Sequence, residues 1–351
     1  MRKVLSVILV LAMIYASSSF AQADSGDAAY EQTLKQLAQQ YILVEVSITE
    51  DEKTTVYSGF EDFYSAVRRE CPSVTDMELA WFTIAYTQCE AYSQETRALE
   101  ILGVKSITSV EQYVVMGEQG DSQAYSSLDV ARATTHSDVM PATDVEEDMD
   151  FGIVLFTYDL FERDTVITES GTERAYYVYA RVEWLDMPLN RWTDTLGIAY
   201  TGALDDSEDI YSSVRHEGSC GFCGESFLLQ ETEEYNSLTG SYSATSSCLE
   251  FDFSGHAIST KIAMRPFMCN HISGDNSVDY YVPTDIYAYL GFTVLISEVG
   301  EMRVAYAHST LGINPSLIAT VSGGSVSAEF TASVQFGFET YFCAPRTLHI
   351  T

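Results

Sequence analysis

The adjacent glycines Gly323 and Gly324 constrain the fold of this chain more than any other local feature. A Gly-Gly pair between two alternating runs is typical of a two-residue β-hairpin turn, because both turn positions need a positive φ. The turn predicts that Ser322 faces Ser325, with further pairs Val321–Val326, Ala319–Ala328, Leu317–Phe330, Ile313–Val334 and Leu311–Phe336. A slip of one residue would turn this apolar set to the opposite face. We therefore expect one well-specified antiparallel hairpin over about 309–338.

The polar face of this hairpin is expected to carry Ser325, Ser327, Glu329, Thr331, Ser333 and Gln335. Upstream, two apolar runs, Phe151–Phe161 and Ala175–Trp184, flank a turn at Glu169–Thr172 and read as paired strands. Further strands are expected near 195–202, 226–231, 249–254, 258–264, 286–297 and 302–308. Residues 151–351 are therefore predicted to form an antiparallel β domain, with a β-sandwich as the favoured architecture.

Residues 24–118 have helical periodicity instead. One apolar stripe at i, i+3, i+4 and i+7 predicts a helix that ends before Pro72: Phe60, Phe63, Tyr64 and Val67. Thr75 followed by Glu78 predicts the capping box of a second helix, with an apolar stripe of Leu79, Phe82, Tyr86 and Cys89. Shorter helices are expected around 95–102 and 109–116. The predicted fold class is α+β by segment: a small N-terminal helical region, then a mainly antiparallel β-sandwich.

Residues 119–150 are predicted to be an acidic linker between these two regions, since Gly, Ser, Asp and Thr are frequent there. The run Asp144–Asp150 reads as a solvated charge run. The alternative is a calcium-binding loop, but the run lacks the alternating ligands and central glycine of an EF-hand.

Residues 1–23 have the three parts of a secretory signal peptide. Arg2 and Lys3 supply the positive start, Val4–Tyr15 is an apolar run, and Ala21-Gln22-Ala23 precedes an expected cleavage site at Asp24. This apolar run is too short to cross a bilayer, which takes about 20 residues. The segment 343–351 has no apolar tail. We expect a secreted, extracellular protein without a stable membrane anchor.

Charge excludes one class of partner. Removing Arg2 and Lys3 from the 18 basic residues leaves 16 against 51 acidic residues, a net charge of −35. Nucleic-acid binding depends on Lys and Arg, so no nucleic-acid partner is expected. The same charge opposes docking on anionic lipid and suits simple solubility, cations or a basic partner. A hydrophobic content of 46% excludes general disorder.

Seven cysteines in an exported chain predict disulfides, with at least one thiol left over. Cys71 and Cys89 would lie about 21 Å apart along two helices at 1.5 Å per residue, too far for a bridge. The disulfide candidates are Cys220, Cys223, Cys248 and Cys269. Their pairing is left open.

The segment Glu217–Gly224 contains Cys-x-x-Cys and admits three kinds of site. A papain-like nucleophile lacks the oxyanion glutamine, which Glu217 replaces, and a suitable downstream His–Asn pair. A thioredoxin-type dithiol lacks the expected flanking strand and helix. A zinc site would use His216, His256 or His271 with the cysteines, but Cys269-x-His271 has the wrong spacing. No metal, no cofactor and no catalytic residue is predicted, and structural disulfides are favoured.

The run Tyr177–Leu185, the run Trp192–Ala199, Tyr306-Ala-His308 and Asn314-Pro-Ser316 resemble a loose group of exported β-rich proteins of Gram-positive bacteria. The similarity covers about 150–351. It implies export and β structure. The group has no assigned activity, so the resemblance implies no functional residues.

Three functions compete. The leading prediction is a non-catalytic exported β-sandwich protein that binds an extracellular ligand or protein, where Trp184 or Trp192 could stack on sugars. The alternatives are a secreted hydrolase of glycans or peptides, built on two close carboxylates, and a pore-forming protein that inserts the 309–338 hairpin.

Overall fold

A computed structural model describes the chain between Gly26 and His349 with several gaps. The described residues are 26–116, 122–137, 152–168, 171–186, 192–220, 226–236, 239, 241–244, 249–264, 267–272, 278–309, 314–332 and 338–349. The signal segment and Asp144–Asp150 lie outside them. The chain divides into a helical unit, Met1–Leu43 with Gly59–Leu102, and a β unit, Val44–Ser58 with Gly103–Thr351. None of the described helices is long and apolar enough to cross a membrane.

The helical unit contains the two helices that the sequence predicts. It consists of α2 (Gly26–Tyr41), α3 (Phe60–Glu70), α4 (Asp76–Thr87), η1 (Glu90–Tyr92) and η2 (Ala98–Gly103). The whole predicted stripe of α3 is buried. Thr75 and Glu78 form the predicted capping box of α4. The apolar stripe predicted for α4 is only partly right, because that helix buries Leu79, Ala80, Thr83, Ile84 and Thr87, while Phe82 and Tyr86 are half-buried.

Two segments predicted as helical are strands. Residues 43–58 form β1 (Leu43–Ile48) and β2 (Lys53–Ser58), and the helix expected at 109–116 is the end of β3 (Val104–Met116). The physical reason lies in Val110, Gln112, Val114 and Met116, which alternate into the core with period two. The expected linker is also partly ordered: β4 (Gln123–Tyr125) pairs with β3, and α5 (Leu128–Ser137) buries Ala131 beside them.

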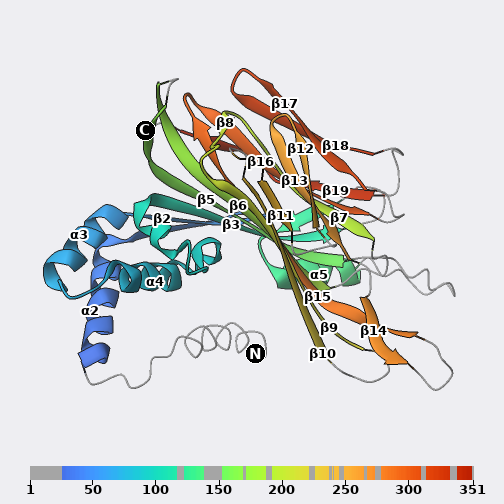
Figure 1. The fold of residues 1–351 in the computed structure, drawn as a ribbon, viewed down its shortest axis with the longest axis horizontal. Helices are drawn as coiled ribbons and strands as arrows, with labels where there is room; N and C mark the ends of the chain where they lie inside the picture. Colours follow the sequence, from blue (N-terminus) through green and yellow to red (C-terminus); the bar gives the residue numbers. More distant parts are fainter. Residues whose placement is uncertain are drawn as a thin grey trace. The chain divides into compact units, whose positions relative to one another are not determined.

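The β unit is built on a twelve-stranded antiparallel sheet (Figure 1). Its main path runs β1-β2-β3-β5-β6-β15-β9-β10-β11, with β4, β8 and β14 at its margins. The remaining strands are β5 (Gly152–Thr168), β6 (Gly171–Asp186), β8 (Ala203–Leu204), β9 (Asp209–Cys220), β10 (Ser226–Asn236), β11 (Ser241–Ala244), β14 (Phe267–Ile272) and β15 (Val278–Ile296).

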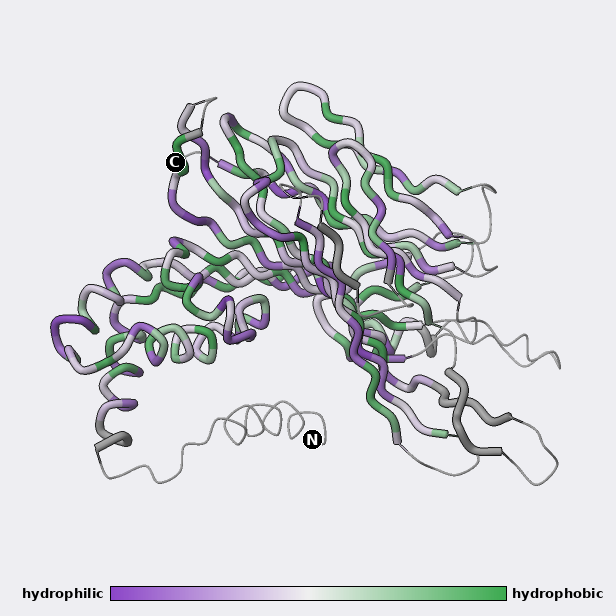
Figure 2. Tube along the Cα trace, in the orientation of Figure 1, coloured by the Kyte–Doolittle hydropathy of each residue, from purple (hydrophilic) through white to green (hydrophobic). Residues whose placement is uncertain are grey.

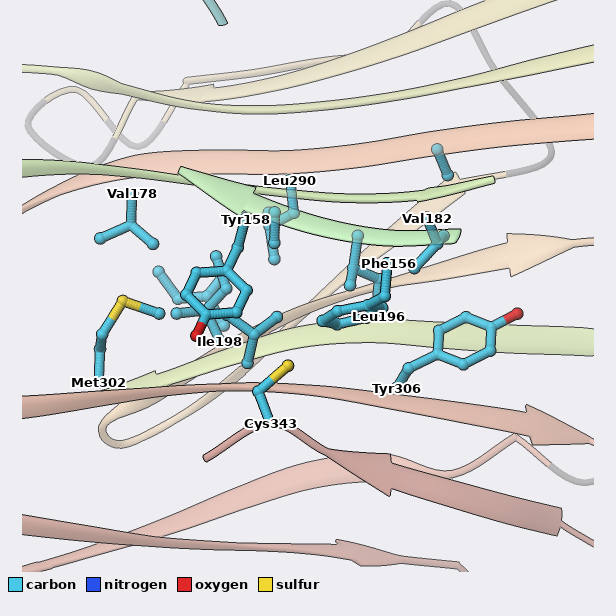
Figure 3. Close-up of a cluster of buried hydrophobic side chains, with 14 of the residues drawn as sticks. Phe156, Tyr158, Val178, Val182, Leu196, Ile198, Leu290, Met302, Tyr306 and Cys343 are labelled. Carbon is cyan, nitrogen blue, oxygen red and sulfur yellow. The ribbon is translucent and has the colours of Figure 1, made fainter. Parts of the chain in front are cut away.

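A six-stranded sheet packs face to face with this large sheet. Its order is β12-β13-β7-β16-β19, with β20 beside β16. The strands are β7 (Thr193–Tyr200), β12 (Leu249–Ser254), β13 (Ala257–Ala263), β16 (Gly300–Ser309), β19 (Phe338–Phe342) and β20 (Arg346–Leu348). The buried core lies between the two sheets, where side chains of Phe156, Ile198, Leu290 and Met302 gather (Figure 3). The predicted α+β class and β-sandwich arrangement are confirmed.

Alternation along the strands produces this layering. Figure 2 shows hydrophobic and hydrophilic residues following one another along the strands. On β7, Leu196 and Ile198 point into the core between the sheets, while Ala199 belongs to a separate cluster on the outer face. The six-stranded sheet is therefore covered on both faces.

Loss of the capping box should destabilise the helical unit. Thr75→Ala removes the side-chain oxygen that accepts from the backbone N–H of Glu78 at 3.2 Å. We expect a loss of about 1 kcal/mol in unfolding free energy, the usual effect of deleting an N-cap. Urea unfolding followed by circular dichroism measures it. Thr75→Ser, which keeps the oxygen, is the control, and equal losses in both variants would contradict the assignment.

Candidate functional site

The Gly-Gly hairpin forms a sheet of its own. Strands β17 (Ser316–Ser322) and β18 (Ser325–Thr331) form a two-stranded antiparallel sheet. The predicted pairs Ser322–Ser325, Val321–Val326, Ala319–Ala328 and Leu317–Phe330 are confirmed. The pairs predicted for Ile313 and Leu311 lie outside the described residues. This hairpin rests on the outer face of the six-stranded sheet, against β7, β13 and β16 (Figure 1).

Small side chains form the floor beneath the hairpin. Leu317 and Val326 are buried against Ala199, Ala257 and Ala305, which come from three adjacent strands. Gly197 lies closest to the hairpin: a Cβ atom added there would be 2.5 Å from Leu317 Cδ2 and 3.0 Å from Ser259 Cβ. A larger residue at position 197 requires at least the Leu317 side chain to shift, so the floor is matched to close packing.

The outward face of the hairpin is polar. Its exposed residues are Thr320, Ser322, Ser325, Ser327 and Glu329. Ile318 departs from the predicted separation, because it pairs with Glu329 on this polar face and is half-buried. The hairpin is amphipathic, with its apolar face covered by the sheet.

The strands on either side of the hairpin are neighbours. β16 pairs directly with β19, from Ala305–Phe342 to Ser309–Phe338, and the hairpin is inserted between these two strands in the sequence. Among the described residues, its polar links to the sheet are few. Thr195 Oγ1 donates to the Pro315 carbonyl oxygen at 2.9 Å, and the Val326 N–H donates to Glu301 Oε2 at 3.2 Å. One isolated parallel bridge joins Gly255 to Ala319.

A buried polar cluster lies at the root of the hairpin. Asp194 of β7 is fully buried and accepts from Trp184 Nε1 at 3.1 Å, from the Tyr306 hydroxyl and from the Ser309 N–H at 3.4 Å. His308 Nδ1 lies 2.8 Å from Asp194 Oδ1. Burial, reinforced by the Asp194 carboxylate, raises the pKa of Tyr306 well above its usual range, so Tyr306 is a neutral donor.

This cluster fixes the end of β16. Ser309 is the last residue of that strand, and Thr195, which follows Asp194, holds the start of the hairpin through Pro315. Glu339 of β19 pairs with His308 across the ladder. The sequence did not point to Asp194, because its partners come from two other strands, β6 and β16, and those on β16 lie more than 110 residues away in the chain. Trp184 is part of the core, so it is not available to stack on a sugar, whereas Trp192 is 52% exposed.

The cysteine candidates lie elsewhere. Cys220 is buried at the end of β9, Cys223 and Cys248 lie outside the described residues, and the side chain of Cys269 in β14 is not described. No disulfide joins two described cysteines. Their pairing stays a prediction. Cys71 is a free thiol. The helix geometry behind the predicted exclusion of a Cys71–Cys89 bridge differs, because α4 ends at Thr87, before Cys89.

The Cys-x-x-Cys segment connects two strands. A strand, β9, does precede it, contrary to the sequence interpretation, but β10 follows from Ser226, and the two form an antiparallel pair. A thioredoxin-type site needs a helix after the motif, so this context differs from it. No group of three metal-binding side chains occurs within the described part of the chain.

Two carboxylates, Asp209 and Glu234, lie close together on neighbouring strands. Burial, together with a hydrogen bond to Asp209, raises the pKa of Glu234. Asp209 also accepts from Asn236 Nδ2 at 2.6 Å. These side chains project from β9 and β10, and neither lines the cleft described below.

Comparisons with known proteins add little. No family model and no curated protein matches the chain. A structure of the manganese lipoxygenase of Gaeumannomyces graminis, with part of the zonadhesin of Komagataella pastoris, is 10% identical, covers 69% of this chain and 92% of that chain, and has a TM-score of 0.18. The NetB toxin of Clostridium perfringens in its membrane-inserted form is 7% identical, with coverages of 56% and 91% and a TM-score of 0.16. Structural similarities with such low TM-scores support no conclusion about the function of this chain.

Filling the floor should displace the hairpin. Gly197→Val places methyl groups where Leu317 packs, and overpacking of this kind costs about 1–3 kcal/mol. Because each 1.4 kcal/mol is about a factor of ten in an equilibrium, cleavage within 316–331 by a nonspecific protease should accelerate about tenfold or more. Gly103→Ala is the control, since no atom lies within 4 Å of its added Cβ. Unchanged cleavage in Gly197→Val would contradict the close packing.

Removing the charge of Asp194 should weaken the hairpin root. Asp194→Asn leaves the donors Trp184 Nε1 and Tyr306 O–H without their carboxylate and places an amide N–H₂ among them. Breaking a buried charged cluster costs about 3–5 kcal/mol. Urea unfolding followed by tryptophan fluorescence, in variants that keep Trp184 and replace Trp81 and Trp192 by Phe, should register this loss. Asp186→Asn, on an exposed ion pair with Arg132, should cost less than about 1 kcal/mol.

Proposed function

We propose that this chain is an exported, non-catalytic pore-forming protein that inserts its β17–β18 hairpin into a membrane. The observation that carries the proposal is the direct pairing of β16 with β19 on either side of the hairpin. Because this ladder is continuous without β17 and β18, the hairpin can leave while the six-stranded sheet keeps its backbone hydrogen bonds.

The composition of the segment supports membrane insertion. Residues 310–337 contain one charged side chain, Glu329, in a chain with 51 acidic residues. Charged side chains on the lipid face of a transmembrane strand cost about 2–4 kcal/mol, and Glu329 lies on the polar face, which would line the water-filled side. The alternation of apolar and Ser/Thr residues is the pattern that such strands need.

Length also fits. The segment 310–337 has 28 residues between the last residue of β16 and the first of β19. Without the Gly323-Gly324 turn the two arms, 310–322 and 325–337, have 13 residues each, more than the roughly 9–11 that a tilted transmembrane strand requires. A pore requires hairpins from several copies, since a lone hairpin leaves unpaired backbone groups in lipid.

In the docked position, the apolar face of the β17–β18 hairpin is buried against the six-stranded sheet until a membrane is available. The side chains of Leu317 and Val326 are covered by a sheet of small residues, so the soluble form hides them from water. The hydrocarbon interior of a membrane would remove the same side chains from water. The acidic charge of the chain opposes anionic lipid, so zwitterionic membranes are the expected target.

Dye release from phosphatidylcholine vesicles tests the function. We expect the mature protein to release a small encapsulated dye. If vesicles of several zwitterionic and glycolipid-containing compositions all retain the dye, the proposal is wrong.

A disulfide clamp tests the moving part. A Cβ at residue 197 would lie 3.3 Å from the Cβ of Leu317, close to the roughly 3.8 Å typical of disulfides. The double variant Gly197→Cys with Leu317→Cys should therefore tie the hairpin to β7 when oxidised. Dye release should be lost in this form and should return when dithiothreitol reduces the bond.

The two single variants are the matched controls, because each carries one of the changes and neither can form the clamp. Peptide mapping verifies that residues 197 and 317 are joined. Full dye release by the verified, oxidised double variant would show that the hairpin does not need to leave the sheet.

A further inference from the structure

An open cleft of about 960 Å³ lies at the β19 margin of the six-stranded sheet. Its walls come from β3, β4 and the β1–β2 turn on one side, and from β16 and β19 on the other. All of these elements belong to the β unit. The volume is at the upper end of the range for small-molecule sites, about 300–1,000 Å³.

One arginine is held in a fixed orientation in this cleft. Arg303 Nε donates to the Cys343 carbonyl oxygen at 2.9 Å, and its guanidinium carbon lies 5.2 Å from the centre of the Phe342 ring. Within the described part of the chain, its two Nη groups have no protein acceptor. A guanidinium fixed through Nε and ring stacking presents two parallel N–H donors to a ligand.

Two neighbouring groups add to this donor set. Gln112 is almost fully buried, and its Oε1 accepts from the Cys343 thiol at 3.1 Å, which leaves the amide N–H₂ as its ligand-facing group. Burial raises the pKa of Cys343 well above its usual range, so the thiol keeps the proton that it donates. Tyr341 contributes a hydroxyl, and its ring is fixed against Phe156 at 5.8 Å between centroids.

The other rim of the cleft carries acceptors. Glu50 and Asp51 lie in the turn between β1 and β2 and line the same cleft. The lining therefore combines fixed N–H donors, carboxylate acceptors and two aromatic rings, Tyr341 and Phe342. A ligand that satisfies all three must donate and accept hydrogen bonds and must also present an apolar face.

We propose that this cleft binds a neutral oligosaccharide. Hydroxyl groups both donate and accept, so one sugar can pair with Arg303 and Gln112 on one side and with Glu50 and Asp51 on the other. The C–H face of a pyranose suits one aromatic ring, that of Tyr341 or that of Phe342, because these two neighbours point to opposite faces of β19. An anionic ligand would meet two carboxylates for one guanidinium, within a chain of net charge −33.

The cleft also touches the hairpin. Phe342, which carries Arg303 on its face, packs against Phe330 of β18 at 5.5 Å between ring centroids. A sugar bound to the Arg303 guanidinium is separated from the hairpin by a single aromatic ring, Phe342. The cleft is therefore placed to couple receptor binding to hairpin release, a step that rests on the proposed function, whereas sugar binding itself does not.

Binding is tested with the full mature chain on immobilised neutral di- to tetrasaccharides of hexoses and N-acetylhexosamines. A second arm uses phosphatidylcholine vesicles with and without a neutral glycolipid that carries the best of these sugars. We expect binding to at least one sugar. Retention by both arms identifies the glycan in either source, and retention by only one arm assigns the source.

Two variants test the site. Tyr341→Phe removes a single oxygen and should weaken binding about fivefold, and Arg303→Lys, which keeps the charge but loses the fork, should weaken it about tenfold or more. Tyr86→Phe, the same change in the helical unit, is the matched control. Circular dichroism verifies that each variant is folded. Absence of binding to every sugar in both arms, or unchanged binding by Tyr341→Phe and Arg303→Lys, would overturn the proposal.

The two proposals fail separately. Sugar binding that depends on Tyr341 and Arg303, without dye release from any vesicle, supports the cleft and removes the pore. Dye release that neither variant nor sugar affects supports the pore and removes the cleft as its receptor site.

Discussion

Burial of the six-stranded sheet on both faces is the constraint on which the rest of the β unit depends. Large residues of β7 and β16 (Leu196, Ile198 and Val304) fill the space between the two sheets. Small residues at the alternate positions, such as Gly197 and Ala305, allow a second layer to approach closely. Because both sets lie on the same strands, a change of register would disturb both layers at once. The hairpin is thus seated by the same alternation that builds the core.

Different interactions stabilise the β17–β18 hairpin and the buried polar cluster around Asp194. Leu317 and Val326 contribute non-directional apolar contacts that water or lipid can replace. Asp194 instead collects directed bonds from Trp184, Tyr306 and Ser309 in a fully buried position. Breaking such bonds leaves buried polar groups unsatisfied, which costs more than separating small apolar surfaces. The structure therefore concentrates rigidity at the root and leaves the hairpin itself held by its weaker contacts.

The features that depend on residues close together in the chain were predictable from the sequence. The Gly323-Gly324 turn determines its own register, and the Thr75–Glu78 box determines where α4 starts, since each involves residues within a few positions of one another. Non-local effects were missed. No strand was predicted at β9, whose Ser212, Ser213 and His216 are polar side chains that only burial by neighbouring strands places in the sheet. β3 was taken for a helix because its mixed run satisfies either period until its partners are known.

The Asp194 cluster illustrates the limit most clearly. Its members come from β6, β7 and β16, and only the sandwich brings them together, so no spacing in the sequence announces them. The pattern Thr195-Leu-Gly-Ile-Ala199 held a usable signal: every second residue is large and the rest are small, as expected for a strand covered on both faces. Such a pattern indicates a second layer without identifying it.

Charge distribution separates the parts of this chain. An excess of carboxylates repels most of the surface from anionic lipid and keeps the protein soluble, whereas residues 310–337 carry only Glu329. A segment selected only to cover a sheet would have no need to limit its solvent face to a single carboxylate, since hydroxyls and carboxylates serve equally well in water. Beside Glu329, Thr320, Ser322, Ser325 and Ser327 are exposed on that face. Hydroxyls are tolerated both in water and in a narrow aqueous passage through lipid, and this dual compatibility is the physical argument that most favours insertion over a purely structural role for the hairpin.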